Sequence, residues 1–482
     1  MNLKPKKLLL NTRQPTGMWV ILFTSILYTM STTTIIITFE DYILNSAPYL
    51  NYLSKSFDLS LYSNLFLFSF ASVIGGILGY NIGHKRSVLI GIFYSCAGLI
   101  LLTINNLALI GFSAYIIGVG VTVPNLYTTL SFLYTQDDPR RHAGFTLVYI
   151  ATIVGAALAI VITDLFARHL GYQSLYLIMA VASIIGALTF LYASATLNKS
   201  VSISDNIDAK FTPSVYSVIF ILIVLSTLIS YLLDYIYVLE GIILIVAAIA
   251  FILMCLYSFF EKDYAQRKRI IALITLSILA GCYWFIDKNI LIIFLYYLRI
   301  YGENANMGIP EFISSNFIFE ANIVLIVIIG IIMAGFWNKN KHQKHIIQIT
   351  RFFSLALLIS AVACLFIALS FFLGKSASYL LLITVALNSI AKVILLPLYY
   401  AIVGKLSPRK YESIIMGFFF LFTAAIGILS IYVNNKTISS QAFHRQELGY
   451  LYSYFFIGVL ITAILAFALS KIWKKYLKSK QI

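Results

Sequence analysis

The residues of this 482-residue sequence that are best suited to chemistry are charged side chains inside long apolar stretches. Asp287 and Lys288 lie within YWFIDKNILIIF, and Lys392 lies within NSIAKVILLPLYY. A charge at the centre of a bilayer costs at least about 2.5 kcal/mol, so a charge kept there is a functional candidate by default. Neighbouring side chains on a helix point about 100° apart, so Asp287 and Lys288 cannot pair well with each other. These three residues are therefore the first candidates for a functional site.

The apolar stretches themselves are typical of membrane-spanning helices. The chain is 61% hydrophobic and 11% charged, with a mean hydropathy of +0.92, which excludes an ordinary soluble enzyme. A spanning helix needs roughly 20 mostly apolar residues, and about fourteen such runs are present. We therefore predict an all-α integral membrane protein. The runs begin near Met18, Leu59, Arg86, Leu107, Ala143, Tyr172, Val215, Ile236, Arg269, Glu311, His345, Ala377, Tyr411 and Leu448.

The net charge of +16 indicates how the chain is oriented. With the N-terminus placed in the cytoplasm, 26 of the 34 Lys and Arg residues fall on the cytoplasmic side and six on the other. The positive-inside rule then predicts that both termini are cytoplasmic. The same rule explains the positive net charge without nucleic-acid binding. The N-terminal segment lacks the cleavage site of a signal peptide. A bias toward Ile, Asn and Lys fits an AT-rich bacterial genome, so we expect a bacterial inner membrane.

The sequence divides into two halves around a polar segment. Residues 197–214 form the most polar internal stretch and are predicted to be a cytoplasmic linker after six helices. Two further apolar runs fill residues 215–262, and six more follow. We therefore expect an N-terminal six-helix bundle over 1–196, two inserted helices over 215–262, and a C-terminal bundle with a basic tail over 263–482.

A short internal repeat supports paired halves. The sequence DPRR (138–141) joins the fourth and fifth runs, and SPRK (407–410) joins the corresponding runs of the second half. Each follows a run interrupted by a proline, Pro124 or Pro397. Helix interruptions at corresponding places in two halves indicate the central site of a transporter.

Three stretches resemble the proton-dependent oligopeptide transporter family of the major facilitator superfamily. They are GVGVTVPN (118–125) with DPRRHAGFTLVYIATIVGAAL (138–158), then KLSPRKYESIIMGFFFLFTAAIG (405–427), and QPTG (14–17). The resemblance implies a major facilitator fold of two six-helix bundles plus two inserted central helices. It also implies proton-coupled uptake of di- and tripeptides by alternating access. The helix interruptions and gating loops would then include Pro124, Asn125, Asp138, Arg140, Arg141 and Pro397.

The sequence departs from the family where the family keeps its charges. The positions of its helix-one motif, Glu-x-x-Glu-Arg-Phe-x-Tyr-Tyr, hold only uncharged residues here: Ser25, Tyr28, Thr29, Met30, Thr32 and Thr33. Val123 replaces the helix-four Lys, Ile153 the helix-five Asn, and Lys392 the helix-ten Glu. Phe419 replaces a helix-eleven Trp, and Tyr80 replaces the superfamily's Asp after helix two. The scaffold matches and the charged site does not.

The family arrangement places helices one, four, seven and ten around a cavity, so Asp287 on helix seven and Lys392 on helix ten are predicted to pair across it. A proton or substrate could break this pair. The alternative is a static pair that only neutralises two buried charges. The predicted substrate and proton pathway comprises Asp287, Lys288, Lys392, Glu320, Tyr28, Tyr149, Tyr283 and Trp284.

Each of the other candidates also has a plainer interpretation. Glu320 can be an interfacial carboxylate, and Asp164 is expected at the outer interface beside Arg168. The tyrosines and Trp284 can be packing residues. The Ser and Thr residues of helix one can hold helices together instead of binding substrate.

Other chemistry is not indicated by the sequence. A nucleotide-binding Gly-rich loop is absent, and His342 and His345 lie in a basic loop without further metal ligands. The four cysteines lie in apolar runs, as small buried residues do. We expect no enzyme activity, no metal and no cofactor, and a monomer whose partners are a small solute, protons and the lipid bilayer. Two alternatives stay open: a transporter of another solute, such as an amino acid or an anion, and a non-transporting, receptor-like relative.

Overall fold

The structure, a computed structural model, describes residues 13–46, 60–136, 138–193, 214–301, 315–339, 346–373, 379–438 and 445–478. All regular elements in these ranges are α-helices or short 3₁₀ turns. Twelve segments are long and apolar enough to cross a membrane. One of them contains two helices, and the apolar helix Ser60–Ile82 brings the number in the described residues to fourteen. The predicted all-α membrane fold is confirmed.

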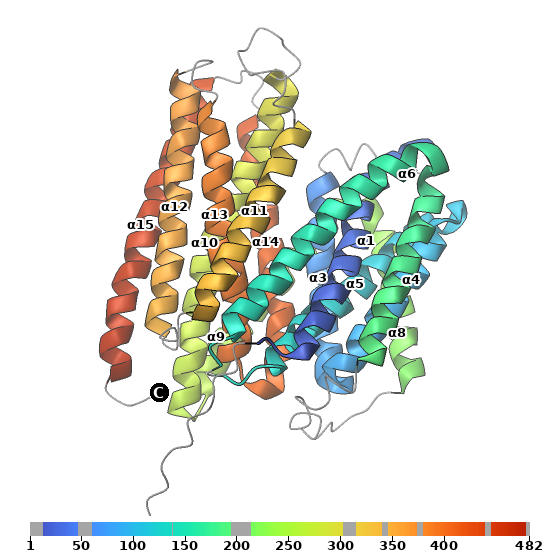
Figure 1. Ribbon diagram of the computed structural model, residues 1–482, viewed down its shortest axis with the longest axis horizontal. Coiled ribbons are helices and arrows are strands. Elements are labelled where there is room, and N and C mark those ends of the chain that lie inside the picture. The colour runs from blue at the N-terminus through green and yellow to red at the C-terminus, as the bar shows by residue number, and fades with distance from the viewer. Residues whose placement is uncertain are drawn as a thin grey trace, which may run out of the picture.

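The N-terminal bundle begins with α1 and ends with the long helix α6 (Figure 1). Its helices are α1 (Thr16–Ser46), α3 (Ser60–Ile82), α4 (His84–Leu102), α5 (Ala108–Phe132) and α6 (Arg141–Tyr192). Helix α6 contains two spans that meet at Gly171, where φ is 76°. Because only glycine adopts such a φ readily, this residue lets the chain turn back without a loop.

The C-terminal bundle consists of α10 (Tyr264–Tyr301), α11 (Ser315–Lys339), α12 (Ile346–Leu373), α13 (Tyr379–Leu406), α14 (Glu412–Ile438) and α15 (Arg445–Lys478). Helix α10 begins five residues before the expected start near Arg269. The Asp263 carboxylate accepts a hydrogen bond from the Ala265 N–H at 2.9 Å, so the helix is capped within the basic segment.

The two inserted helices are α8 (Val215–Leu232) and α9 (Ile236–Phe260), joined by a 3₁₀ turn. Helix α8 packs on α5 of the N-terminal bundle, whereas α9 packs on α14 and α10 of the C-terminal bundle. The inserted helices therefore touch both bundles.

The bundles converge toward the bottom of Figure 1, at the end where α6 (Arg141–Tyr192) and α14 (Glu412–Ile438) begin. This end is called the closed end below. The bundles contact each other mainly through α3 with α14 and α6 with α11. Ser413 donates to the carbonyl of Gly76 at 3.1 Å, and Gly417 of α14 lies against the backbone of Ser72. Glycine allows this approach because a side chain there would fill the space between the helices.

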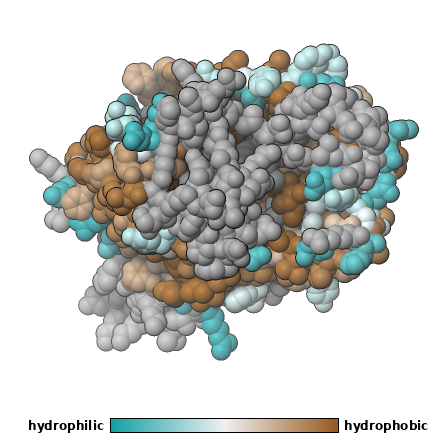
Figure 2. Space-filling model, turned by 90° about the horizontal axis from the view of Figure 1, so that it is seen from above, coloured by the Kyte–Doolittle hydropathy of each residue, from teal (hydrophilic) through white to brown (hydrophobic). Residues whose placement is uncertain are grey.

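The outer surface is apolar, as a surface in lipid must be. Seen from above, hydrophobic residues form much of the visible perimeter (Figure 2). Large exposed side chains on that surface include Phe220, Ile332 and Ile464, which are 68%, 64% and 59% exposed. In a bilayer these side chains contact acyl chains, so their exposure carries no cost.

Candidate functional site

A buried ion pair lies inside the C-terminal bundle. The Lys392 ammonium of α13 lies 2.8 Å from Oδ1 of Asp287 on α10, and Asp287 is 1% exposed. Asn388, one turn before Lys392, donates from Nδ2 to the same Oδ1 at 2.8 Å. The predicted contact between helices seven and ten is therefore present. One carboxylate oxygen receives both donors, and both come from the same face of α13.

Aromatic side chains surround this pair. Tyr283 lies one turn before Asp287 on α10, is fully buried and interacts electrostatically with the Asp287 carboxylate. Tyr149 of α6 interacts with the same carboxylate from the N-terminal bundle. The structure thus brings four predicted pathway residues, Asp287, Lys392, Tyr149 and Tyr283, into one cluster, which we call the central cluster together with Asn388.

Lys288 lies beside the central cluster without joining the ion pair. Its ammonium is 5.4 Å from the ring centroid of Trp284, one turn earlier on α10. It interacts electrostatically with Asp287 and Lys392. Among the described residues, the buried indole N–H of Trp284 and the hydroxyl of Tyr283 have no hydrogen-bond partner. Hydrogen-bond donors therefore remain available next to an ammonium group.

A second polar cluster joins the two bundles at the closed end. Arg141, at the start of α6, is 2% exposed and donates from Nε to the carbonyl of Ala401 on α13 at 3.0 Å. Its Nη2 donates to the hydroxyl of Ser131. Glu412 of α14 is 1% exposed, and a side chain on Gly404 would collide with Arg141, Ser131 and Glu412 together. We call these groups the closed-end cluster.

The preceding turn is held by a more exposed pair. The Arg140 guanidinium lies 2.8 Å from the Asp138 carboxylate. The hydrogen bonds that Arg140 donates to this carboxylate raise the pKa of Arg140. Arg140 also donates to the carbonyl of Arg13 at 2.7 Å. This contact ties the segment before α1 to the DPRR turn.

The prolines and Asn125 belong to the helices that meet near the closed end. Helix α5 continues through Pro124, and α13 continues through Pro397. Asn125 donates to the carbonyl of Gly75 on α3 and to that of Val121, both at 2.7 Å. The amide therefore ties α5 to α3 beside the interrupted turn.

Comparison with known proteins decides the class to which this scaffold belongs. A sequence model of the POT family matches residues 85–451, about three quarters of the chain. The chain belongs to the POT family. It is therefore a transporter and not an enzyme, as the sequence predicts.

The relatives of this POT family member are distant in sequence. The di-/tripeptide transporter of Lactococcus lactis subsp. cremoris is 23% identical over 398 residues, covering 75% of this chain and 76% of the relative. Dipeptide and tripeptide permease A of Salmonella typhimurium is 24% identical over 404 residues, covering 80% and 78%.

Solved structures show the same fold. The crystal structure of a POT family transporter with a thioalcohol-conjugated peptide has a TM-score of 0.68 at 20% identity, covering 93% of this chain and 96% of that one. The crystal structure of peptide transporter POT with sulfate has a TM-score of 0.67 at 18% identity, covering 95% of each chain. The predicted major facilitator architecture is confirmed.

Some predicted pathway residues of this POT family member lie outside the central cluster. Tyr28 of α1 interacts with Thr32 and with Tyr115 of α5. Ser31 and Thr32 approach the Tyr115 hydroxyl at 2.9 and 3.1 Å, so helix one uses its polar groups to hold α5. Glu320 is exposed, which favours the interfacial alternative. Asp164 is also exposed.

The sequence alone does not identify several residues of the central and closed-end clusters. Asn388 lies four residues before Lys392, a spacing that places both on one helix face and could have revealed it. Glu412 lies two residues after the SPRK repeat, but nothing in the sequence indicates that it is buried beside Arg141. The pairing of Ala401 with Arg141 depends on how the bundles dock, whereas Ser131 lies in the same bundle as Arg141.

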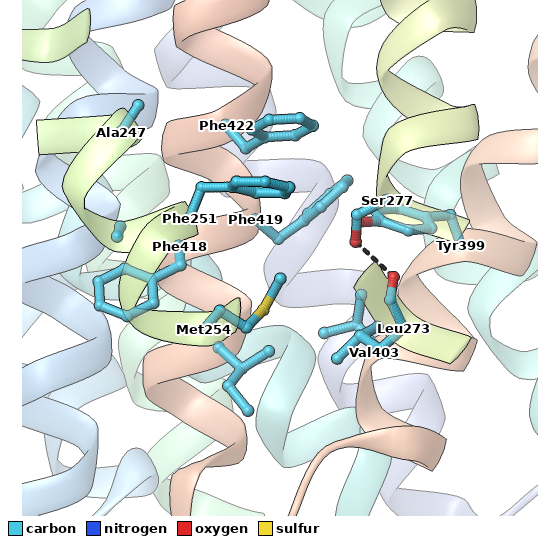
Figure 3. Close-up of a pocket in the computed structure, with 12 residues that line it drawn as sticks. Ala247, Phe251, Met254, Leu273, Ser277, Tyr399, Val403, Phe418, Phe419 and Phe422 are labelled. Atoms are coloured by element: carbon cyan, nitrogen blue, oxygen red, sulfur yellow. Dashed lines mark hydrogen bonds between the residues drawn. The ribbon is translucent and has the colours of Figure 1, made fainter. Parts of the chain in front are cut away.

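A separate apolar pocket lies between the inserted helix α9 and the C-terminal bundle (Figure 3). It holds about 420 Å³, counted out to its open mouth, and side chains of α9, α10, α13 and α14 line it. Tyr399 donates a hydrogen bond of 2.5 Å to Ser277 in its wall. Because no charged residue lines it, this pocket is distinct from the central cluster.

Proposed function

We propose that this POT family member takes up di- and tripeptides across a bacterial inner membrane, coupled to protons, by alternating access. The buried Asp287–Lys392 ion pair is the observation that carries the proposal. Both named relatives are described as carrying di- or tripeptides, which supports this substrate class.

The pair offers a simple way to couple a proton to a substrate. A proton on the Asp287 carboxylate removes its charge and releases Lys392, and a charged substrate group that engages either member of the pair breaks it in the same way. Because Asn388 of α13 donates to the same oxygen, the Asp287 side chain of α10 stays held against α13 while its charge changes. A rearrangement of α13 would reach the closed end, since the Ala401 carbonyl that binds Arg141 lies on that helix.

Alternating access requires two moving units. We assign these to residues 1–196 and 263–482, joined by the linker 197–214, with 215–262 as inserted helices. The contacts of the closed-end cluster and the glycine contacts of α3 with α14 would open during each cycle. Pro124 and Pro397, which each remove one helix hydrogen bond, are the proposed bending points.

The same proposal places the closed end on the cytoplasmic side. The excess of Lys and Arg in the segments assigned to that side, both termini included, supports this orientation. We take the chain to act as a monomer, because one chain supplies every residue of the central cluster.

Uptake of labelled Ala-Ala into proteoliposomes tests the proposal, with and without an inward proton gradient. We expect gradient-driven accumulation by the native chain and its loss in Asp287→Asn. Lys471→Gln, at an exposed position near the end of α15, serves as the control. Full gradient-driven uptake by Asp287→Asn would remove the coupling role. Uptake of other solutes alone, or binding without transport, would replace peptide uptake with one of the alternatives named above.

A further inference from the structure

The charges near the centre of the membrane do not balance. Asp287 carries one negative charge, and its carboxylate is already engaged by Lys392 and Asn388. Lys288 adds a second positive charge. In the part of the chain that the structure describes, its ammonium forms no ion pair, and its contact is with the ring of Trp284. The central region therefore has one cation in excess.

The position of Lys288 on α10 directs its side chain between α13 and α14. Asp287 marks the direction of α13, and Gly281 lies against α14. At 100° per residue, Trp284 and Lys288 lie between these two directions. Both α13 and α14 contact the N-terminal bundle, and earlier in the same sector of α10 Leu273 and Ser277 line the pocket beside α9. The side chains of Trp284 and Lys288 are both half-buried.

A positively charged substrate group has no counterpart here. Among the described side chains, Asp287 and Glu412 are the only buried carboxylates. Glu412 belongs to the closed-end cluster, where Arg141 is its neighbour. Helix α1 contains no acidic residue between Thr16 and Phe39. An ammonium group entering the central region would therefore meet an excess of positive charge and no free carboxylate.

We propose that the central site selects small solutes that carry a carboxylate and lack a free ammonium group, such as N-acylated dipeptides, and that Lys288 binds the carboxylate. The inference rests on the transport function proposed above and specifies its substrate class. The ammonium supplies a charge-assisted hydrogen bond, and the indole N–H of Trp284 is an additional donor on the same helix sector. A zwitterionic dipeptide can bind its carboxylate in the same place, but its ammonium must displace Lys392 from Asp287.

Three matched probes test this selection: N-acetyl-Ala-Ala (an anion), Ala-Ala (a zwitterion) and Ala-Ala-amide (a cation). Each is measured as a competitor for binding to the purified chain and as a labelled substrate in proteoliposomes. We expect N-acetyl-Ala-Ala to bind more tightly than Ala-Ala, and roughly tenfold or more tightly than Ala-Ala-amide, because only the anion matches the excess charge. Equal binding of N-acetyl-Ala-Ala and Ala-Ala would overturn the selection.

Variants of Lys288 separate recognition from folding. Lys288→Gln is expected to weaken binding of N-acetyl-Ala-Ala by roughly tenfold or more and to leave Ala-Ala-amide unchanged or improved. Lys288→Arg is expected to restore binding, which a purely structural role of the lysine would not produce. Lys471→Gln removes the same charge far from the site and is expected to change nothing.

The outcomes distinguish this inference from the proposed function. If Ala-Ala is transported and N-acetyl-Ala-Ala neither binds nor crosses, selection of anions is wrong and peptide transport stands. Unchanged N-acetyl-Ala-Ala binding in Lys288→Gln would also overturn the role of Lys288. If N-acetyl-Ala-Ala binds with the expected order but no probe is transported, the inference stands and the transport proposal fails.

Discussion

Arg141 of α6 donates to the backbone carbonyl of Ala401 on α13 at 3.0 Å, and this contact joins the two bundles through a side chain that is 2% exposed. Burial of a guanidinium is costly unless neighbouring groups supply an opposite charge and hydrogen-bond acceptors. Ser131 and Glu412 provide that compensation, from α5 and α14. The closed-end cluster therefore draws on both bundles and would be separated whenever that end opens.

The first prediction concerns the coupling of Arg141 with Glu412. Removing one partner leaves the other charge buried, so Arg141→Gln and Glu412→Gln are each expected to destabilise the chain by about 3 kcal/mol. The double variant is expected to lose at least about 1 kcal/mol less than the sum of the two. Thermal unfolding in detergent measures this. The more exposed pair Asp138→Asn with Arg140→Gln is the control, with coupling of about 1 kcal/mol or less. Strict additivity of the Arg141 and Glu412 changes would show that the two charges do not interact.

The second prediction concerns the close approach of α3 and α14. A Cβ on Gly76 would lie 2.6 Å from the carbonyl oxygen of Ser413, so Gly76→Ala forces the two helices apart. We expect a loss of about 1–3 kcal/mol and faster labelling of cysteines introduced at the closed end. Gly241→Ala is the matched control because a Cβ there meets nothing within 4 Å, and it is expected to gain up to about 1 kcal/mol. Equal behaviour of the two variants would contradict a tight helix contact at Gly76.

The third prediction concerns the wall of the apolar pocket. Tyr399→Phe removes the hydrogen bond to Ser277, but the Ser277 hydroxyl keeps its bond to the Leu273 carbonyl at 2.8 Å. The expected loss is therefore only about 1 kcal/mol. Tyr399→Ala also removes a ring that packs against Phe353 and Phe419, and is expected to cost about 3–5 kcal/mol. Thermal unfolding of both variants checks the order, and a larger loss in Tyr399→Phe than in Tyr399→Ala would show that packing is not the main role of the ring.

The sequence was sufficient for the spans and for the Asp287–Lys392 contact. Runs of about 20 apolar residues identify spanning helices directly, because lipid leaves the backbone no other form. Charges at membrane depth are so rare that one acid on α10 and one base on α13 have few possible partners. The family arrangement then placed the two helices side by side.

The closed-end cluster could not be predicted in the same way. Arg141 was identified by the DPRR motif, but its partners lie 260 residues away at Ala401 and on α14 at Glu412. Such contacts depend on how two rigid bundles dock, which local periodicity does not describe. Helix one shows the same limit. Its polar residues fit a substrate site or a helix contact equally well in sequence, and only the Tyr115 hydrogen bonds favour the second.

The last prediction separates a static ion pair from a coupling pair. Asp287→Asn leaves the Lys392 ammonium buried without its partner and is expected to cost about 3–5 kcal/mol. Adding Lys392→Gln removes both charges, and we expect the double variant to regain at least half of that loss, because an uncharged pair of similar size needs no compensation. If the pair couples protons to transport, this more stable double variant still fails to accumulate substrate against its gradient, although it equilibrates substrate in the absence of one. A static pair predicts the opposite, with recovery of gradient-driven uptake in step with stability. Unfolding temperatures and uptake measured on the same preparations decide between them. Lys471→Gln with Glu447→Gln, both at exposed positions, controls for the loss of two charges.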